Sequence, residues 1–129
     1  MKLQPDRIDV QAISGYGPGW VGVGTGAAAE KITHSVILSS HGDRIDWDAR
    51  VFDDLGPEHF ARLAQMKAEV VVFGSGERIR FPGPAWLRPL AERGIGLETM
   101  DTAAACRTYN ILAQEGRQVA VALLLEQPR

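Results

Sequence analysis

Two stretches decide the fold: Val70-Val71-Val72-Phe73-Gly74-Ser75-Gly76-Glu77 and Leu97-Glu98-Thr99-Met100-Asp101-Thr102. Each is an apolar strand pattern that runs directly into a loop of glycines or small polar residues. Residues 84–93, between the two stretches, predict a short helix that ends at Gly94. Two strands joined by a helical crossover pair in parallel. We therefore expect both loops at the carboxyl edge of one sheet, where open α/β folds bind their ligands.

The segment after the second stretch predicts one helix and one further strand. Residues 103–112 have a helical pattern, with Asp101 or Thr102 as N-cap and Gly116 as the glycine after the last turn. Residues 119–125 are almost wholly apolar, which is typical of a central strand covered on both faces. The C-terminal part is therefore predicted to be βαβαβ.

The N-terminal part is predicted to be rich in β-structure. Residues 7–14 and 31–39 alternate between apolar and polar side chains and each predict one strand. The second of these strands is expected to form a hairpin with residues 44–48. A helix is expected to open at Pro57 and to end near Met66, with its buried face towards the sheet.

Six glycines fall between residues 15 and 26, and Gly17, Gly19 and Gly22 have the spacing G-x-G-x-x-G. A dinucleotide-binding motif needs this pattern to open a helix. Residues 20–23 instead resemble a strand. We interpret the segment as a glycine-rich hairpin rather than a nucleotide site.

Composition limits the classes of function. With 129 residues and 45% hydrophobic side chains, the chain is expected to form a single domain over residues 1–129. The net charge of −2 and the scattered basic residues disfavour nucleic acid as a partner. A lone cysteine fits a reducing compartment, and no apolar run approaches the ~20 residues that span a bilayer. The first six residues lack the apolar core of a signal peptide. A cytoplasmic protein without transmembrane segments is expected.

The loop at Gly74, Ser75 and Gly76 has two readings. Its glycines could present backbone N–H groups to an anion, or serve only a tight turn at positive φ. Asp101 and Thr102 could likewise be plain helix caps, or could leave free N–H groups opposite the glycine loop as a shared anion pocket. The loop lacks the lysine of a P-loop.

Cys106 lies near a helix N-terminus, where a thiol can become nucleophilic. It would need a histidine base, and the three histidines lie far away in the sequence. The alternative is a small buried hydrophobic residue. The histidines show no metal-ligand spacing, so we predict no metal, no cofactor and no catalytic residues.

Five motifs, in order, carry a resemblance to a known family. They are Phe73-Gly74-Ser75-Gly76, Gly94-Ile95-Gly96-Leu97-Glu98, Met100-Asp101-Thr102, Ala105-Cys106-Arg107-Thr108-Tyr109-Asn110 and Glu115-Gly116-Arg117. Together they resemble a family of unknown biochemical function that includes bacterial and archaeal proteins, the adipogenesis-associated Mth-type domain protein and mitochondrial complex I assembly factor 3. The chain is identified as a bacterial member of this family.

This resemblance implies a three-layer α/β fold with a mixed central sheet in which the last strand runs antiparallel to the others. Residue patterns alone leave the direction of that strand open. The resemblance also implies a role close to assembly of respiratory complex I and a protein partner. It supplies no established catalytic residues.

Two functions of different class follow. The first is a non-enzymatic interaction or assembly factor, and the second is a protein or enzyme that binds a small anionic ligand. Both would use the carboxyl edge, and a homodimer is compatible with base rates for soluble proteins. The candidate site residues are Gly74, Ser75, Gly76, Glu77, Asp101, Thr102, Cys106, Arg107, Tyr109, Asn110 and Arg117.

Overall fold

The computed structural model describes residues 10–24 and 28–127. The strands are β1 (Ile13–Gly17), β2 (Trp20–Val23), β3 (Glu30–Ile32), β4 (Val36–Ser39), β5 (Arg44–Asp46), β6 (Val70–Gly74), β7 (Gly96–Met100) and β8 (Val119–Leu123). The α-helices are α1 (Pro57–Leu63), α2 (Arg88–Glu92) and α3 (Thr102–Gln114), and two 3₁₀ turns cover Phe52–Asp54 and Pro84–Leu87.

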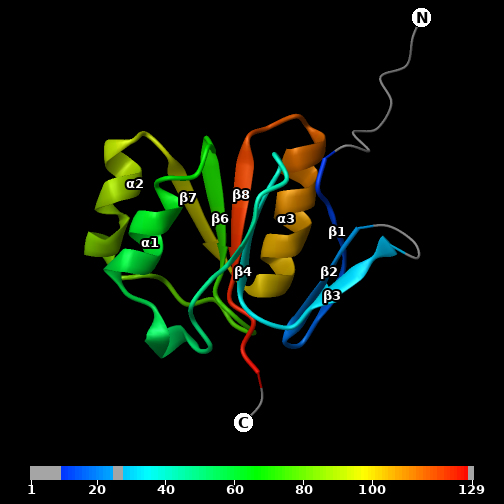
Figure 1. Cartoon of the computed structure of the whole chain (residues 1–129). Helices are drawn as coiled ribbons and strands as arrows, with labels where there is room; N and C mark the ends of the chain where they lie inside the picture. Colours follow the sequence, from blue (N-terminus) through cyan, green and yellow to red (C-terminus); the bar gives the residue numbers. More distant parts are fainter. Residues whose placement is uncertain (1–9, 25–27, 128–129) are drawn as a thin grey trace, which may run out of the picture.

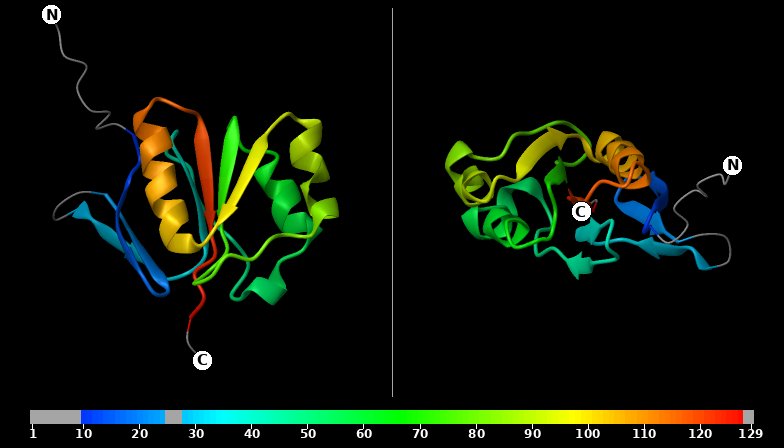
Figure 2. Two further views of the ribbon diagram at one scale, coloured as in Figure 1. Left: turned by 180° about the vertical axis from the view of Figure 1, so that it is seen from behind. Right: turned by 90° about the horizontal axis from the view of Figure 1, so that it is seen from above.

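Three layers are built around a five-stranded sheet with the order β5-β4-β8-β6-β7. Helices α1 and α2 cover one face of this sheet, and α3 with the antiparallel sheet β1-β2-β3 covers the other (Figure 1). The views from behind and from above show the same separation (Figure 2). The three-layer α/β fold with a mixed central sheet is thus confirmed, as are the β-rich N-terminal part and the C-terminal βαβαβ part.

The direction implied for the last strand is wrong. Strand β8 pairs in parallel with β6, from Val70 opposite Val119 to Gly74 opposite Leu123. On its other side it pairs antiparallel with β4. The strand direction therefore changes between β8 and β4, and again between β4 and β5. This arrangement leaves β6, β7 and β8 all ending at the same carboxyl edge.

Two cores lie on the two faces of this sheet, and the alternation of side chains along β8 separates them. Val119, Val121 and Leu123 pack towards α3 and the small sheet, whereas Ala120 and Ala122 pack towards α1 and α2. All five residues of β8 are buried. This accounts for the unbroken apolar sequence, since a central strand needs apolar side chains on both faces.

The strand predicted over residues 7–14 is placed wrongly. The first described strand, β1, begins only at Ile13 and continues to Gly17. Residues 7–9 lie outside the described part. Gly17 is the last residue of β1. The indole of Trp20 lies across it, so a Cβ atom at this position would collide with that ring. Gly19 makes the hairpin turn at φ +74°. The glycine-rich segment is therefore a hairpin.

The strand predicted over residues 31–39 is in fact two strands in different sheets, β3 and β4. Ser35 lies between them, and its backbone oxygen accepts the Trp47 N–H at 3.0 Å. Its hydroxyl oxygen accepts the Leu125 N–H at 2.9 Å. Both bonds come from residues far along the chain, so Ser35 redirects the backbone into the central sheet.

The helix boundaries follow the capping residues closely, with two differences. The helix expected over residues 84–93 begins as a 3₁₀ turn and becomes α2, with Pro89 in the first turn of α2. Helix α1 ends at Leu63 rather than near Met66. Asp101 caps α3, and Gly116 follows it with φ +86°.

Candidate functional site

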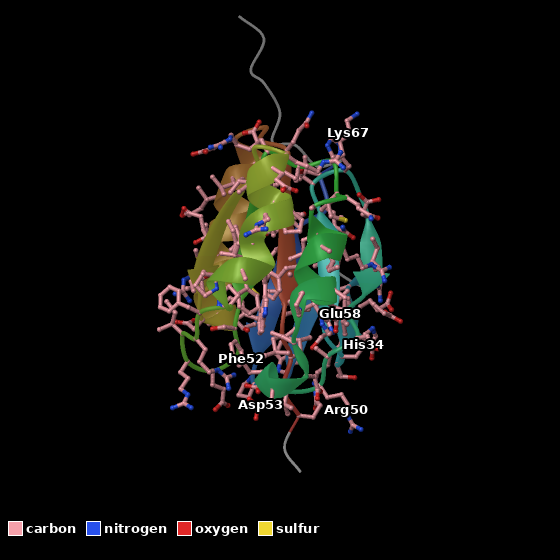
Figure 3. The ribbon with its side chains drawn as sticks, turned by 90° about the vertical axis from the view of Figure 1, so that its left-hand side faces the viewer. His34, Arg50, Phe52, Asp53, Glu58 and Lys67 are labelled. Carbon is pink, nitrogen blue, oxygen red and sulfur yellow. The ribbon has the colours of Figure 1, made fainter. Side chains whose placement is uncertain are left out.

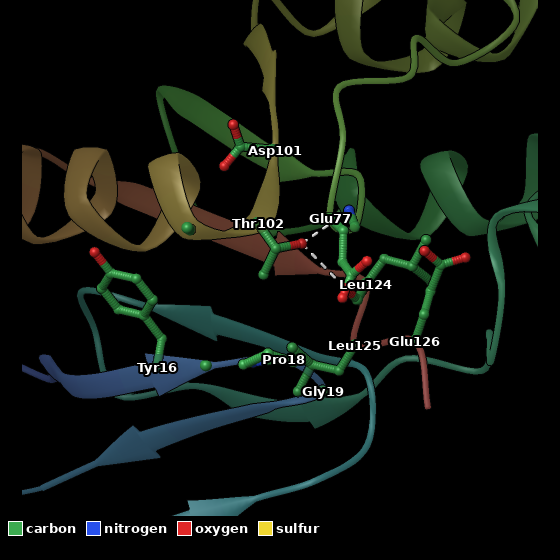
Figure 4. A pocket seen from close by; sticks show the side chains of 12 residues that line it. Tyr16, Pro18, Gly19, Glu77, Asp101, Thr102, Leu124, Leu125 and Glu126 are labelled. Atoms are coloured by element: carbon green, nitrogen blue, oxygen red, sulfur yellow. Dashed lines mark hydrogen bonds between the residues drawn. The ribbon is translucent and has the colours of Figure 1, made fainter. Parts of the chain in front are cut away.

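The two polar loops meet at the carboxyl edge, and Thr102 joins them. The Thr102 N–H donates to the Gly76 oxygen at 2.8 Å, and the Gly76 N–H donates to Thr102 Oγ1 at 2.9 Å. The Thr102 hydroxyl donates in turn to the Leu124 oxygen at 3.0 Å (Figure 4). One side chain therefore connects the chain segments that follow β6, β7 and β8.

The first part of the glycine loop is structural. A Cβ atom on Gly74 would lie 3.0 Å from both the Cα of Thr102 and the Cβ of Ala105, so the glycine permits close approach of α3. Ser75 is fully buried. Its hydroxyl donates to the Arg78 oxygen and accepts the Arg80 N–H, each at 2.8 Å. Neither residue presents a surface to a ligand.

A cavity of about 330 Å³ opens beside this junction. Four of the predicted residues line it: Gly76, Glu77, Asp101 and Thr102. The remaining lining residues were not predicted from the sequence, and they come from the β1–β2 turn, the start of α3 and the segment after β8. They are Tyr16, Gly17, Pro18, Gly19, Ala103, Leu124, Leu125 and Glu126 (Figure 4). We call this space the edge cavity.

Several backbone N–H groups at the edge cavity already have acceptors within the protein. Thr102 N–H bonds to Gly76, and Ala104 N–H donates to the Asp101 carboxylate at 2.8 Å. Of the first three N–H groups of α3, only that of Ala103 has no acceptor among residues 10–24 and 28–127. The Gly76 N–H is also bonded to protein. These bonded N–H groups of Gly76, Thr102 and Ala104 are therefore not free to hold an anion.

The charges of the edge cavity also oppose an anion. Among residues 10–24 and 28–127, its lining carries three carboxylates, Glu77, Asp101 and Glu126, and no cationic side chain. Arg80 pairs with Glu126 at 2.5 Å and stacks over the Phe52 ring at 4.7 Å. Within the described part of the chain, Glu77 and Asp101 have no ion-pair partner within 4.0 Å.

Arg107 lies next to the mouth of the edge cavity without lining it. Its guanidinium donates to the Tyr16 hydroxyl at 2.8 Å and lies 5.9 Å from the centre of that ring. This contact links α3 to the β1–β2 hairpin. Tyr16 is 38% exposed, which is high for an aromatic side chain. The pair thus forms an outer wall of the edge cavity.

Cys106 and Tyr109 face the core instead of the edge cavity, and both are fully buried. Burial raises the pKa of the Cys106 thiol to about 12, so the thiolate needed for nucleophilic chemistry is scarce at neutral pH. Burial also raises the pKa of Tyr109, whose hydroxyl donates to the Gln11 oxygen at 2.6 Å.

The last two candidates have structural partners away from the edge cavity. Asn110 bonds to both backbone groups of Ile13, accepting its N–H at 2.9 Å and donating to its oxygen at 2.8 Å. These two hydrogen bonds hold β1 against α3. Arg117 forms an exposed ion pair with Glu69.

Two of the three histidines, His34 and His59, have side-chain partners of their own. His34 contacts Asp46 at 2.8 Å, at the same end of the molecule as the start of α1 (Figure 3). His59 accepts the Gly56 N–H and donates to the Asp48 oxygen. Over residues 10–24 and 28–127 there is no cluster of three metal-ligating side chains. Within the same residues, no helix has the length and apolarity to cross a bilayer.

Solved structures of other bacterial proteins have the same fold. The crystal structure of a Bordetella parapertussis protein is 35% identical, with a TM-score of 0.81 over 91% of this chain and 97% of that one. A Bordetella pertussis protein described as a Mth938-like domain is 31% identical, with a TM-score of 0.77 over 98% of this chain and 93% of that one.

Curated relatives carry two kinds of name. The bovine NADH dehydrogenase (ubiquinone) 1 alpha subcomplex assembly factor 3 is 35% identical over 82 residues, which are 62% of this chain and 45% of that protein. This chain thus spans less than half of that assembly factor. A 13 kDa major membrane protein of Francisella tularensis is 26% identical over 70% of this chain and 75% of its own length.

The family is established by a match over most of the chain. A family model described as "Protein of unknown function (DUF498/DUF598)" matches residues 13–124. This range includes β1, α3, β8 and every residue of the junction around Thr102. The chain belongs to this DUF498/DUF598 family of proteins of unknown function.

Proposed function

We propose that the protein is a non-enzymatic assembly factor that holds a protein partner during assembly of respiratory complex I. The observation that carries this proposal is the 35% identity over 82 residues to a bovine protein named as a NADH dehydrogenase assembly factor. The buried state of Cys106 and Tyr109 supports a role without catalysis. The aligned part covers 45% of the bovine protein.

The proposed docking surface is the edge cavity with its outer wall, Tyr16 and Arg107. It combines an exposed aromatic side chain with apolar walls, both features common at protein interfaces, and its rim carries carboxylates that can select a partner by charge. We propose a cytoplasmic location. The small-anion alternative gains no support from the edge cavity, because the ionisable side chains that line it are carboxylates.

A quantitative pull-down from the native host tests this function. The tagged natural chain is expected to enrich complex I subunits or assembly proteins, measured by mass spectrometry. Glu77→Lys is expected to lower this enrichment by about tenfold, because a reversed charge at the rim costs more than ~1.4 kcal/mol of binding. Gly74 is unsuitable for such a variant, since it is buried against α3.

Glu92→Lys is the matched control, because it makes the same charge change on the exposed surface of α2, outside the edge cavity. Its enrichment should equal that of the natural chain. Absence of any complex I component from the natural pull-down would contradict the proposed function. Equal enrichment with Glu77→Lys would contradict the placement of the surface.

A further inference from the structure

The walls of the edge cavity are apolar and come from separate parts of the chain. Pro18 belongs to the β1–β2 turn, Ala103 to the first turn of α3, and Leu124 and Leu125 to the segment after β8. A volume of about 330 Å³ falls in the range of ligand pockets, roughly 300–1,000 Å³. Such a space favours burial of an aliphatic side chain, at roughly 25 cal/mol per Å² of apolar surface removed from water.

Among the described residues, the rim of the edge cavity carries more negative than positive charge. Arg80 neutralises Glu126 at 2.5 Å, and Arg107 donates to the Tyr16 hydroxyl while its charge also acts on Asp101. Glu77 is exposed and has no cationic partner in the described part of the chain. In the Asp101 carboxylate, Oδ1 accepts the Ala104 N–H, and the other oxygen accepts no hydrogen bond from the described residues.

Apolar walls beside the carboxylates of Glu77 and Asp101 match one chemistry best. We infer that the edge cavity binds a segment of the partner protein in which a lysine or arginine lies next to an aliphatic side chain. The aliphatic group fills the space between Pro18 and Leu125, and the cation reaches Glu77 and Asp101 at the rim. The inference rests on the proposed function for the existence of a partner and adds the chemistry that the partner presents.

Two structural features favour a protein segment over a small amine. A free amine would meet the carboxylates but would leave the apolar walls facing water, which forfeits most of the available burial. Tyr16 extends the apolar surface beyond the cavity, and its ring is held in place by Arg107. A tyrosine fixed at the edge of a pocket is a common anchor at protein interfaces.

The test uses the isotope-labelled full chain and two blocked peptides, acetyl-Leu-Arg-Leu-amide and acetyl-Leu-Glu-Leu-amide, at millimolar concentrations. Amide chemical shifts are followed by NMR. The arginine peptide is expected to give saturable shifts at Gly19, Gly76 and Ala103, and the glutamate peptide none. In a double variant, Glu77→Gln with Asp101→Asn, binding of the arginine peptide should weaken about tenfold as two charged contacts are lost.

Asn is chosen at position 101 because it caps a helix as well as Asp does, so α3 keeps its N-terminus. The control carries Glu92→Gln with Glu98→Gln, which removes the same charge from two exposed positions outside the cavity. It should bind the arginine peptide like the natural chain.

Equal shifts with both peptides, shifts only outside the edge cavity, or no shifts would overturn the inference. A preference for the glutamate peptide would instead support the anion site. The pull-down separates the two proposals. Complex I components captured through Glu77 without arginine-peptide binding would leave the function standing and remove the inference. Arginine-peptide binding without capture of complex I components would support the binding chemistry of the edge cavity and contradict the proposed function.

Discussion

Replacing Phe73 with alanine is expected to lower the free energy of unfolding by about 3–5 kcal/mol, the usual cost of truncating a buried phenylalanine. Phe73 lies in β6 and is fully buried. Its ring centre lies 5.2 Å from that of Phe60 and 5.8 Å from that of Trp47, both in edge-to-face geometry. Removing the ring leaves a cavity between α1 and the sheet that backbone shifts cannot close.

Phe81→Ala is the matched control, since the same truncation falls on a side chain that is 69% exposed. Its effect should stay within about 0.5 kcal/mol. Urea unfolding followed by tryptophan fluorescence measures both variants. Similar losses of stability in the two would contradict the placement of Phe73 in the core.

Replacing Thr102 with valine is expected to lower the free energy of unfolding by about 2–4 kcal/mol. The change leaves two polar backbone groups without a hydrogen-bond partner, at roughly 1–3 kcal/mol each. The Gly76 N–H loses its acceptor, and the Leu124 oxygen loses its donor. Valine has nearly the same shape as threonine, so packing changes little. The loss measures how strongly this hydroxyl holds the carboxyl edge together.

Thr108→Val provides the comparison, on the same helix and half-buried like Thr102. Within the described part of the chain its hydroxyl makes no hydrogen bond, so the expected change is below about 0.5 kcal/mol. Denaturant midpoints give both values. If Thr102→Val were as mild as Thr108→Val, the three-way junction would have no energetic importance.

The strongly patterned C-terminal part could be predicted from sequence because its signals are local. Strand β6 ends in glycines, Asp101 is a strong N-cap, and Gly116 closes α3. The N-terminal part could not be predicted as well, because its boundaries depend on distant contacts. Ser35 lies between β3 and β4 and is held by bonds from Trp47 and from Leu125, which is 90 residues along the chain. No window of sequence contains that information.

The candidate site was predictable in part for the same reason. Gly76, Glu77, Asp101 and Thr102 meet because two parallel strands end together. Cys106, Tyr109 and Asn110 lie on the same helix, but helical spacing does not say which face turns to the core. The opposite wall, contributed by the β1–β2 turn, depends on how the hairpin docks on α3 through Asn110. Only the tertiary structure reveals that contact.

The central claim is that a partner docks at the edge cavity, and site-specific photo-cross-linking tests it most directly. The photoreactive residue p-benzoylphenylalanine is placed at the cavity rim in one variant, by Glu77→p-benzoylphenylalanine. In a second variant, Glu92→p-benzoylphenylalanine, it lies on α2. After irradiation of native host cells, we predict an adduct with a complex I subunit or assembly protein from position 77 and none from position 92. An adduct from position 92 alone, or none from either, would contradict the account.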